Sequence, residues 1–367
     1  MVADLLNPNW LGPLSPLLEG GDLPYRLFMS RSGSTWLLPD SSKRVRGALL
    51  VFPPRSPLLR LAWEAWRRGL PVGLGMGLNA QYLDKLVAAL APHLRTEGVV
   101  IHIGTPGAYR KAVLGLWAGG AAQAIIKLAL APAADPWVVW EAHVLSRLMD
   151  WGEGLIPKLL YTGQHAGRAF HATAPVMGHP APKRLTRQHL TYSARLFRQE
   201  SSQYPWSESP LRAEWLEQIA RRGLVEQLPT LEQAVIWLEK RLAQKMLSFG
   251  WAHGDFVPWN TRCVDGRLLV LDWEMARPNR PPGYDILHFE SMQAALRGRP
   301  PKISWKTLRA WLEVNAPEWV GLEQELYVTY LVDQAIYYLK AKLEAPEVGE
   351  EVVLNWLLKE IQLAVED

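Results

Sequence analysis

The stretch HGDFVPWN, residues 253–260, lies between a predicted helix and a predicted β-hairpin. The helix is expected over residues 231–250, with Thr230 and Gln233 as a possible capping box at its start. After the stretch, the sequence TRCV, the pair Asp265-Gly266 and the sequence RLLVLD predict two short strands joined by a two-residue turn. The stretch is therefore a loop between two regular elements.

The register of this hairpin brings distant oxygens together. If Val264 faces Arg267, then Asn260 lies opposite Leu271 and beside Asp272. Amide and carboxylate oxygens suit a hard cation such as Mg²⁺, which takes few protein ligands and completes its shell with phosphates and waters. Asp255, on the incoming loop, is placed to accept a proton from a bound hydroxyl. The sequence thus predicts a magnesium site beside a general base.

A lysine and a glutamate form a second candidate group. Lys127 interrupts the apolar strand AIIKLAL, and Glu141 shares one helix face with Val138, Leu145 and Leu148. That helix is expected to begin with Asp135 as N-cap and Pro136 at the first position. A carboxylate on an apolar face needs a partner, and Lys127 on the preceding strand is the natural one. The pair is either structural or holds a lysine that orients nucleotide phosphates.

Two segments contain closely spaced glycines, one a candidate phosphate-binding loop and the other similar to a dinucleotide fingerprint. Gly104, Thr105 and Gly107 lie in IGTPGAYRK, between two predicted antiparallel strands, where backbone N–H groups can approach phosphate oxygens. Glycine in a hairpin loop also occurs in ordinary turns, so this motif is weak by itself. The stretch GLGMGLN, residues 73–79, lacks a third glycine and a preceding strand, so a plain loop is predicted there.

Composition limits the class of protein. The 367 residues are 49% hydrophobic and 21% charged, with a formal net charge of +4 that favours anionic ligands without a basic run for nucleic acid. No apolar run approaches the ~18 residues of a membrane span. Asp4 argues against an export signal, and Cys263 is the single cysteine, so a cytoplasmic protein is expected. The histidines are scattered and no two have the spacing of metal ligands, which disfavours a metallohydrolase. The 18 tryptophans are expected to lie in hydrophobic cores.

The chain resembles the aminoglycoside phosphotransferase and choline kinase-like superfamily, which shares the protein-kinase fold. The resemblance rests on HGDFVPWN, VLDWE and YDILHF, with support from Lys127 and Glu141. The five-residue spacing from Asp255 to Asn260 is that of the kinase catalytic loop. The resemblance implies an α+β, two-lobed fold with a small antiparallel-sheet lobe and a larger, mainly helical lobe. The expected domains are an α/β extension packed on the small lobe (1–95), a nucleotide-binding N-lobe (96–178) and a helical C-lobe (179–367).

The resemblance also implies roles for individual residues. Asp255 would be the catalytic base, with His253 bracing its loop and Asp285 anchoring that loop from a helix start. Asn260 and Asp272 would hold magnesium, with help from Glu274. Lys127 would contact the phosphates of ATP or GTP and Glu141 would position it. The linker at residues 173–177, including Thr173 and Pro175, would offer backbone hydrogen bonds to the base.

The expected activity is magnesium-dependent transfer of a γ-phosphate to a hydroxyl of a small molecule. Only residues 273–284 separate Asp272 from Asp285, too few for the activation segment and peptide platform of a protein kinase. Sugars, amino alcohols and aminoglycosides all remain open as acceptors, and the oligomeric state is open too. The alternative is a catalytically silent nucleotide-binding pseudokinase or scaffold, although the chain retains every residue that such proteins usually lose.

Overall fold

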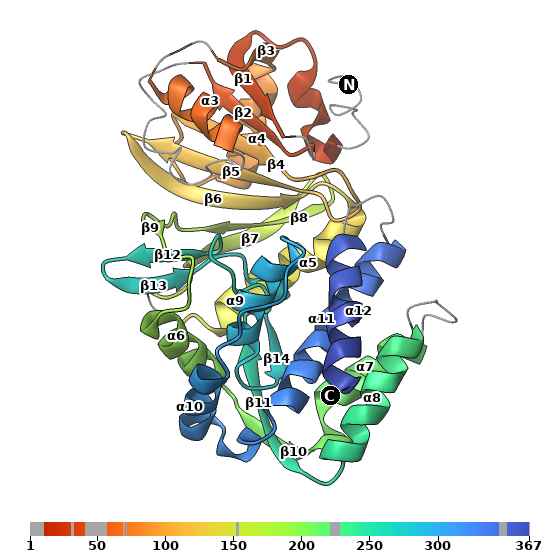
Figure 1. The fold of residues 1–367 in the computed structure, drawn as a ribbon. Helices are drawn as coiled ribbons and strands as arrows, with labels where there is room; N and C mark the ends of the chain where they lie inside the picture. Colours follow the sequence, from red (N-terminus) through yellow and green to blue (C-terminus); the bar gives the residue numbers. More distant parts are fainter. Residues whose placement is uncertain are drawn as a thin grey trace. The chain divides into compact units, whose positions relative to one another are not determined.

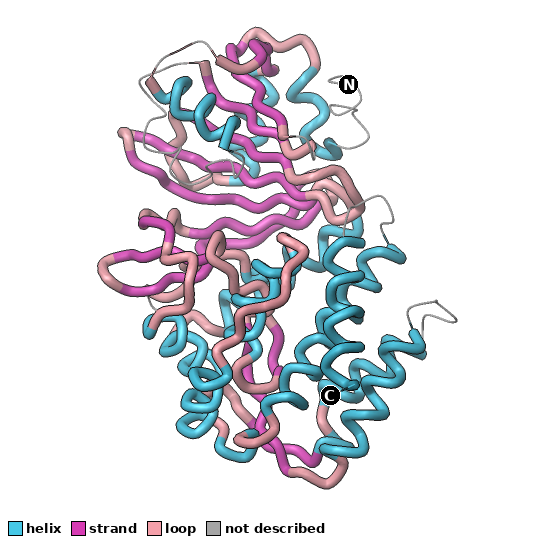
Figure 2. The backbone as a smooth tube through the Cα atoms, in the orientation of Figure 1, coloured by secondary structure: helices cyan, strands magenta, loops and turns pink. Residues whose placement is uncertain are grey.

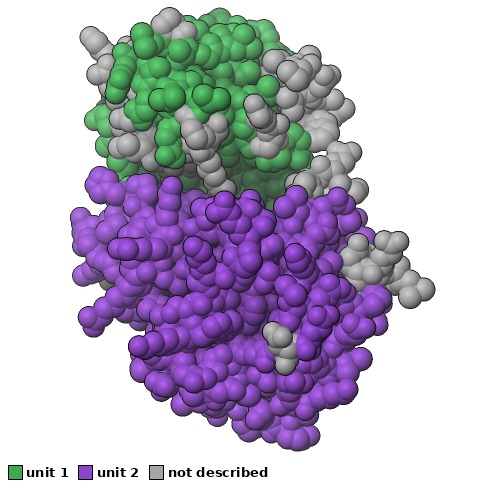
Figure 3. Space-filling view, in the orientation of Figure 1, with its two compact units in different colours: residues 1–178 green, residues 179–367 purple. Residues whose placement is uncertain are grey.

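The computed structural model describes residues 11–30, 33–40, 57–68, 70, 72–151, 154–220, 228–344 and 351–366. Two compact units divide the chain, unit 1 (Met1–Gly178) and unit 2 (His179–Asp367), which Figure 3 colours separately. No helix in the described ranges combines the length and the apolar character that crossing a bilayer requires. Each unit has a hydrophobic core of its own.

Unit 1 is built on one antiparallel sheet (Figure 1) with the strand order β3-β1-β2-β4-β5-β6-β8-β7. Strands from residues 1–95 thus continue the sheet of residues 96–178. The strands are β1 (Leu23–Met29), β2 (Thr35–Pro39), β3 (Leu74–Leu78), β4 (Gly98–Ile103), β5 (Lys111–Ala118), β6 (Ala121–Ala129), β7 (Leu159–His165) and β8 (Arg168–Thr173). The helices are η1 (Gly12–Leu18), α3 (Pro57–Arg67), α4 (Ala80–Leu90), η3 (Pro132–Ala134) and α5 (Asp135–Arg147).

The two faces of this sheet are covered differently. Helix α4 and the short η1 pack on one face, where alternate strand residues such as Leu114 and Ile126 form the main core. Helix α3 packs Trp63 and Trp66 on the other face, over β1, β2 and β4. Helix α5 covers β6 and β8 on the face that α3 covers. Lys127 of β6 lies on that second face, because its neighbours Ile126 and Leu128 belong to the core on the first face.

Unit 2 is mainly helical, as Figure 2 shows. Its described residues form two three-stranded sheets of short strands. Its strands are β9 (His179–Pro180), β10 (Ser202–Pro205), β11 (Met246–Ala252), β12 (Thr261–Val264), β13 (Arg267–Val270) and β14 (Arg277–Arg280). Its helices are α6 (Arg187–Phe197), η4 (Trp206–Glu208), α7 (Pro210–Ala220), α8 (Leu228–Leu242), η5 (Trp273–Met275), α9 (Tyr284–Ala295), α10 (Trp305–Asn315), η6 (Pro317–Trp319), α11 (Glu323–Glu344) and α12 (Glu351–Glu366).

The helix expected over residues 231–250 is partly wrong. Helix α8 ends at Leu242, and the following residues form β11, which pairs with β10 and β14. Thr230 is already helical, so it does not cap α8. Strand β11 is buried along nearly its whole length because helices and other strands surround it. A run of mostly apolar residues does not distinguish such a strand from a buried helix.

Tryptophan fills both cores, as expected from the composition. Trp63 and Trp117 are fully buried in unit 1, and Trp206, Trp215 and Trp319 are fully buried in unit 2. Several of these rings meet edge to face; the centroids of Trp206 and Trp215, for example, lie 5.8 Å apart. The tryptophan content therefore reflects core packing.

Candidate active site

The hairpin after residues 253–260 has the predicted register. Val264 pairs with Arg267, and the turn residues Asp265 and Gly266 both have positive φ angles, of 47° and 73°. The N–H of Leu271 donates to the carbonyl of Asn260 at 2.8 Å, so the pairing continues to the loop. The predicted position of Asn260 opposite Leu271 is confirmed.

Asp255 and Asn260 are in direct contact. The Nδ2 of Asn260 donates to Asp255 Oδ2 at 2.7 Å and to the Asp255 carbonyl at 3.1 Å. These two bonds orient the buried amide with its nitrogen toward Asp255 and its Oδ1 away from it. The other carboxylate oxygen of Asp255 lies 3.4 Å from His288 Nε2, yet the side chain stays 30% exposed. Asp255 is held in place and remains accessible.

His253 and Asp285 fix the backbone of the loop. The Asp285 carboxylate accepts from the N–H groups of His253 and Gly254 at 3.0 and 3.1 Å. The His253 ring accepts at Nδ1 from the Asp255 N–H and donates from Nε2 to the carbonyl of Leu271, which defines the neutral tautomer. Burial lowers the pKa of His253. The His253 ring therefore contacts the backbone of both Asp255 and Leu271, and its role as a positioning residue stays a prediction.

Only glycine fits at position 254. Its φ is 79°, and a Cβ on it would lie 2.5 Å from the carbonyl oxygen of Met275. Burial raises the pKa of Asp285, because the charged form gives up hydration. The two N–H donors compensate by solvating the carboxylate. Gly254 and Asp285 are therefore parts of one support beneath Asp255.

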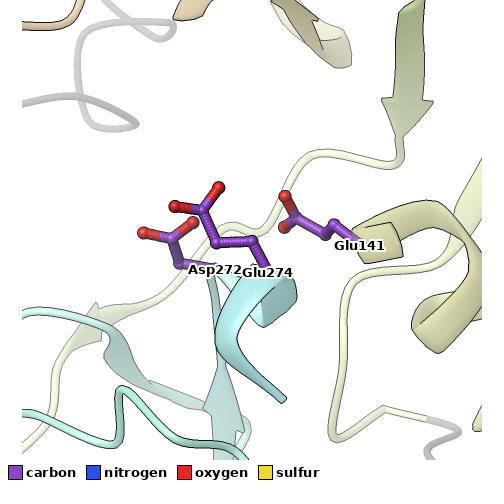
Figure 4. Close-up of side chains that lie close together, drawn as sticks. All are labelled: Glu141, Asp272 and Glu274. Carbon is purple, nitrogen blue, oxygen red and sulfur yellow. The ribbon is translucent and has the colours of Figure 1, made fainter. Parts of the chain in front are cut away.

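Asp272 and Glu274 flank buried Trp273 in the sequence. Figure 4 shows their two carboxylates side by side. Their carboxylate oxygens lie within 4.8 Å of one another. Asp272 adopts a left-handed backbone conformation, φ 69° and ψ 68°, which ends β13 and starts η5. Strained backbone of this kind concentrates at functional sites. Carboxylate oxygens are ligands that fit Mg²⁺ better than a soft metal. The role of Asn260 as a further oxygen ligand stays a prediction.

Lys127 and Glu141 form the predicted ion pair in unit 1. Lys127 Nζ donates to both carboxylate oxygens of Glu141, at 2.8 and 2.6 Å. The side chains are only 17% and 4% exposed, so little solvent screens the pair. Glu141 shares its buried helix face with Val138 and Leu145, as the spacing predicts. Figure 4 labels Glu141 at this position on α5.

The start of helix α5 differs from the prediction. Asp135 is the first helical residue and Ala134 is the N-cap, because η3 runs directly into α5. The Asp135 carboxylate instead accepts from Arg168 Nη1 at 2.5 Å and from the Ala169 N–H at 2.7 Å. Asp135 therefore fastens the helix to β8, and the N-cap assignment is wrong.

The glycine segment at residues 104–110 closes into a compact loop between β4 and β5. The Gly104 N–H donates to the Lys111 carbonyl at 2.9 Å, and Arg110 Nε donates to the Gly104 carbonyl at 2.9 Å. Arg110 N–H also donates to the Gly107 carbonyl. Thr105 Oγ lies 3.1 Å from the hydroxyl of Ser34, which belongs to the extension. Buried Arg110 thus holds both glycines of the loop in place.

The end of β8 leads into the predicted base-binding linker. Thr173 pairs with Ile125 in the sheet, and its Oγ1 lies 3.5 Å from the Ile125 carbonyl. The N–H of Ala174 donates to the carbonyl of Lys158 at 2.8 Å. Pro175 has no N–H, so it can offer a nucleotide base only its carbonyl. The role of this linker in base recognition stays a prediction.

The sequence reasoning missed three residues that touch the candidate groups. His288 contacts Asp255, and Tyr330 OH lies 3.3 Å from His288 Nδ1. His171 lies directly across from Lys127 in the sheet, with its Nε2 3.8 Å from Glu141 Oε2. The spacing of three between Asp285 and His288 could have revealed His288, since it places both on one helix face. Nothing in the local sequence marks Tyr330.

Because Lys127 and Glu141 form an ion pair, the effects of substituting them on nucleotide binding should not be additive. Lys127→Ala and Glu141→Ala should each weaken nucleotide binding, and each leaves a buried charge without its main partner. The double mutant should lose less than the sum, with a coupling of roughly 1 kcal/mol or more. The Asp135–Arg168 pair, which joins α5 to β8, is the matched control: its mutants should lower stability and leave nucleotide affinity unchanged. Additive losses for Lys127 and Glu141 would contradict the pairing.

Buried histidines predict a stability loss on acidification. Burial lowers the pKa of His171 and His253, and it lowers the pKa of His189 to about 4. In the unfolded chain a histidine has a pKa of about 6.5, so below that pH the unfolded chain binds more protons than the folded protein. The free energy of unfolding therefore falls as the pH is lowered below about 6.5. The fall in Tm between pH 6.5 and 5 should be smaller in His189→Gln than in the wild type. Exposed His93→Gln is the control, and equal pH slopes in all three proteins would refute the prediction.

The sequence and the fold are similar to those of known proteins. Residues 126–301 match the model described as "Phosphotransferase enzyme family". No match was found among curated proteins. Among solved structures, choline kinase LicA from Streptococcus pneumoniae is similar, with 14% identity, a TM-score of 0.54 and coverage of 78% of this chain and 99% of that one. Aminoglycoside phosphotransferase APH(4)-Ia matches with 13% identity, a TM-score of 0.54 and coverage of 78% and 99%.

A third structure, a choline/ethanolamine kinase family protein from Mesorhizobium loti, shares 14% identity at a TM-score of 0.51, covering 78% of this chain and 95% of that one. Such low identities establish the fold alone. The chain therefore has a protein-kinase-like α+β fold, and its resemblance to the aminoglycoside phosphotransferase and choline kinase-like superfamily is confirmed.

Proposed function

We propose that this protein is a magnesium-dependent phosphotransferase that moves the γ-phosphate of ATP or GTP to a hydroxyl group of a small molecule. The observation that carries the proposal is the contact between Asp255 and Asn260 at the base of the hairpin that ends in Asp272. An accessible carboxylate, an oriented amide and two further carboxylates are the parts that phosphoryl transfer needs. The family match at residues 126–301 supports the same reaction class.

Asp255 is the proposed general base. The acceptor hydroxyl oxygen forms a bond to the γ-phosphorus, the bond from that phosphorus to the bridging oxygen of the β-phosphate breaks, and the hydroxyl proton passes to Asp255. Because Asn260 holds one carboxylate oxygen and His288 lies beside the other, Asp255 enters the reaction already oriented. His253 and Asp285 contribute by fixing the backbone that carries it.

Asn260, Asp272 and Glu274 are the proposed magnesium ligands. Magnesium supplies positive charge that neutralises the phosphates during transfer. Lys127, oriented by Glu141, adds a fixed ammonium group for the phosphates from unit 1. Also in unit 1, Gly104, Thr105 and Gly107 are the proposed backbone and hydroxyl donors to the nucleotide phosphates, and Thr173 and Pro175 are the proposed backbone partners of the base. A related structure, of an APH(4)-Ia mutant, is described as a ternary complex with ADP and hygromycin B.

A small-molecule acceptor is favoured over a protein. The segment after Asp272 forms η5 and then β14, which pairs with β11, and α9 begins at Tyr284. These elements take up most of the stretch that would otherwise carry an activation segment. Sugars, amino alcohols and aminoglycosides are the candidate classes, and a cytoplasmic location without nucleic-acid partners suits each of them.

A metabolite-library screen for magnesium-dependent nucleotide consumption tests the proposal. The protein should consume ATP or GTP with at least one hydroxyl compound and should show only slow hydrolysis without it. The silent alternative predicts nucleotide binding with no consumption above that of Asp255→Asn. Consumption that persists without a divalent cation would contradict the magnesium requirement.

A further inference from the structure

The first residue of β5, Lys111, lies on the same sheet face as Lys127. Val113 is directly opposite Lys127 in the register, and Lys127 is opposite His171. Successive residues of a strand point to opposite faces, so Lys111 and Val113 share the face of Lys127 and His171. Ala112 and Leu114, between and after them, are buried in the core on the other face. The two lysines are diagonal neighbours across adjacent strands, about 7–8 Å apart at the backbone.

Lys111 also forms the end of the glycine loop. Its carbonyl accepts the N–H of Gly104 at 2.9 Å, which closes the loop that contains Thr105 and Gly107. The side chain of Lys111 is half-buried. A lysine fixed at the base of a glycine loop, on the face that carries the oriented Lys127, is well placed to meet the phosphates that the loop receives.

The electrostatics of this face agree with the register. Burial is the main cause of the lowered pKa of His171, and the charges of both Lys127 and Lys111 lower it further. Both ammonium groups are therefore near enough to act on one buried imidazole. His171 stays neutral, and the Glu141 carboxylate is held by Lys127. Two ammonium groups on one sheet face suit a ligand that carries several negative charges.

We propose that Lys111 is a second phosphate-binding lysine, which recognises the di- or triphosphate chain of the nucleotide together with Lys127. This inference rests on the proposed function, because it assumes that unit 1 binds a nucleotide. It gives a role to a residue to which the sequence motifs assign none, since a lysine at the start of a strand is ordinarily solvated.

The test measures binding of Mg·ATP, ADP and adenosine by calorimetry. Lys111→Met should weaken ATP and ADP about 10–100-fold, the range for loss of a charge-assisted hydrogen bond, and leave adenosine unchanged. Lys111→Arg should restore most of the ATP affinity. The control is Lys85→Met, an exposed lysine on α4, which packs on the opposite sheet face; it should behave like the wild type. Lys111→Gln provides a second neutral variant if methionine impairs folding.

The outcomes separate the inference from the proposed function. Wild-type ATP affinity in both neutral Lys111 variants overturns the inference and leaves the proposed function standing. An equal loss for adenosine and ATP also overturns it, because that result means a distorted loop rather than a lost phosphate contact. A wild-type protein that binds no nucleotide overturns the proposed function, and the inference with it.

Discussion

Asp255→Asn is expected to lower turnover by about 10²–10⁴-fold, the usual range for a lost general base. Asparagine has nearly the same shape and keeps an oxygen for the bond from Asn260 Nδ2, so the loop should remain in place. What it loses is the ability to accept a proton. Nucleotide affinity and Tm should therefore change little. The turnover number should fall strongly when it is measured under conditions where chemistry limits the rate.

The matched control for this variant is Asp265→Asn. Asp265 lies at the exposed tip of the same hairpin, with a φ of 47° that asparagine tolerates, and it carries the same charge. Its turnover should equal that of the wild type. If Asp255→Asn also keeps wild-type turnover, Asp255 is not the base. If both variants lose turnover, the effect comes from net charge and not from proton transfer.

Asp272→Asn is expected to raise the magnesium concentration needed for half-maximal activity roughly tenfold or more. The substitution removes one negative charge from the proposed ligand set, and oxygen charge governs much of the affinity for a hard cation. Asparagine also tolerates the left-handed backbone of Asp272, so folding should be preserved. Maximal turnover should fall as well, because less positive charge is available during transfer.

Nucleotide binding without metal distinguishes this account from a structural role for Asp272. Loss of a negative charge should leave metal-free ATP affinity unchanged or improve it, since Asp272 repels bare phosphates. A structural role predicts a lower Tm with an unchanged magnesium midpoint. Activity titrated with magnesium, together with Tm, for the wild type and Asp272→Asn therefore decides between them. An unaltered midpoint would refute Asp272 as a metal ligand.

Local chemistry made the hairpin and the unit 1 ion pair predictable. The Asp265-Gly266 turn fixes the register, because both residues accept positive φ, and the register alone places Asn260 opposite Leu271. The contact between Lys127 and Glu141 follows from the cost of a buried carboxylate without a partner. In both cases one strong local constraint decides the arrangement.

Other elements depend on distant packing that the sequence does not display. Residues 73–79 were expected to be a loop, but β3 forms there and pairs with β1. Gly77 lies so close to the backbone of Gly21 that a Cβ would clash. Glycine is needed at this position because two segments of backbone approach closely there, and not because the chain forms a loop. Likewise, Gly250 in β11 packs against the Phe197 carbonyl of α6. Tyr330 reaches His288 only because α11 packs along α9.

The most direct test of the central claim is phosphorus-31 NMR of a reaction that contains the protein, Mg²⁺, ATP or GTP, and a hydroxyl acceptor found by screening. The account predicts that the γ-phosphate signal declines while signals of the nucleoside diphosphate and of a new phosphomonoester grow in equal amounts, and that Asp255→Asn abolishes this growth. Release of inorganic phosphate alone, or equal phosphomonoester formation by Asp255→Asn, would contradict it.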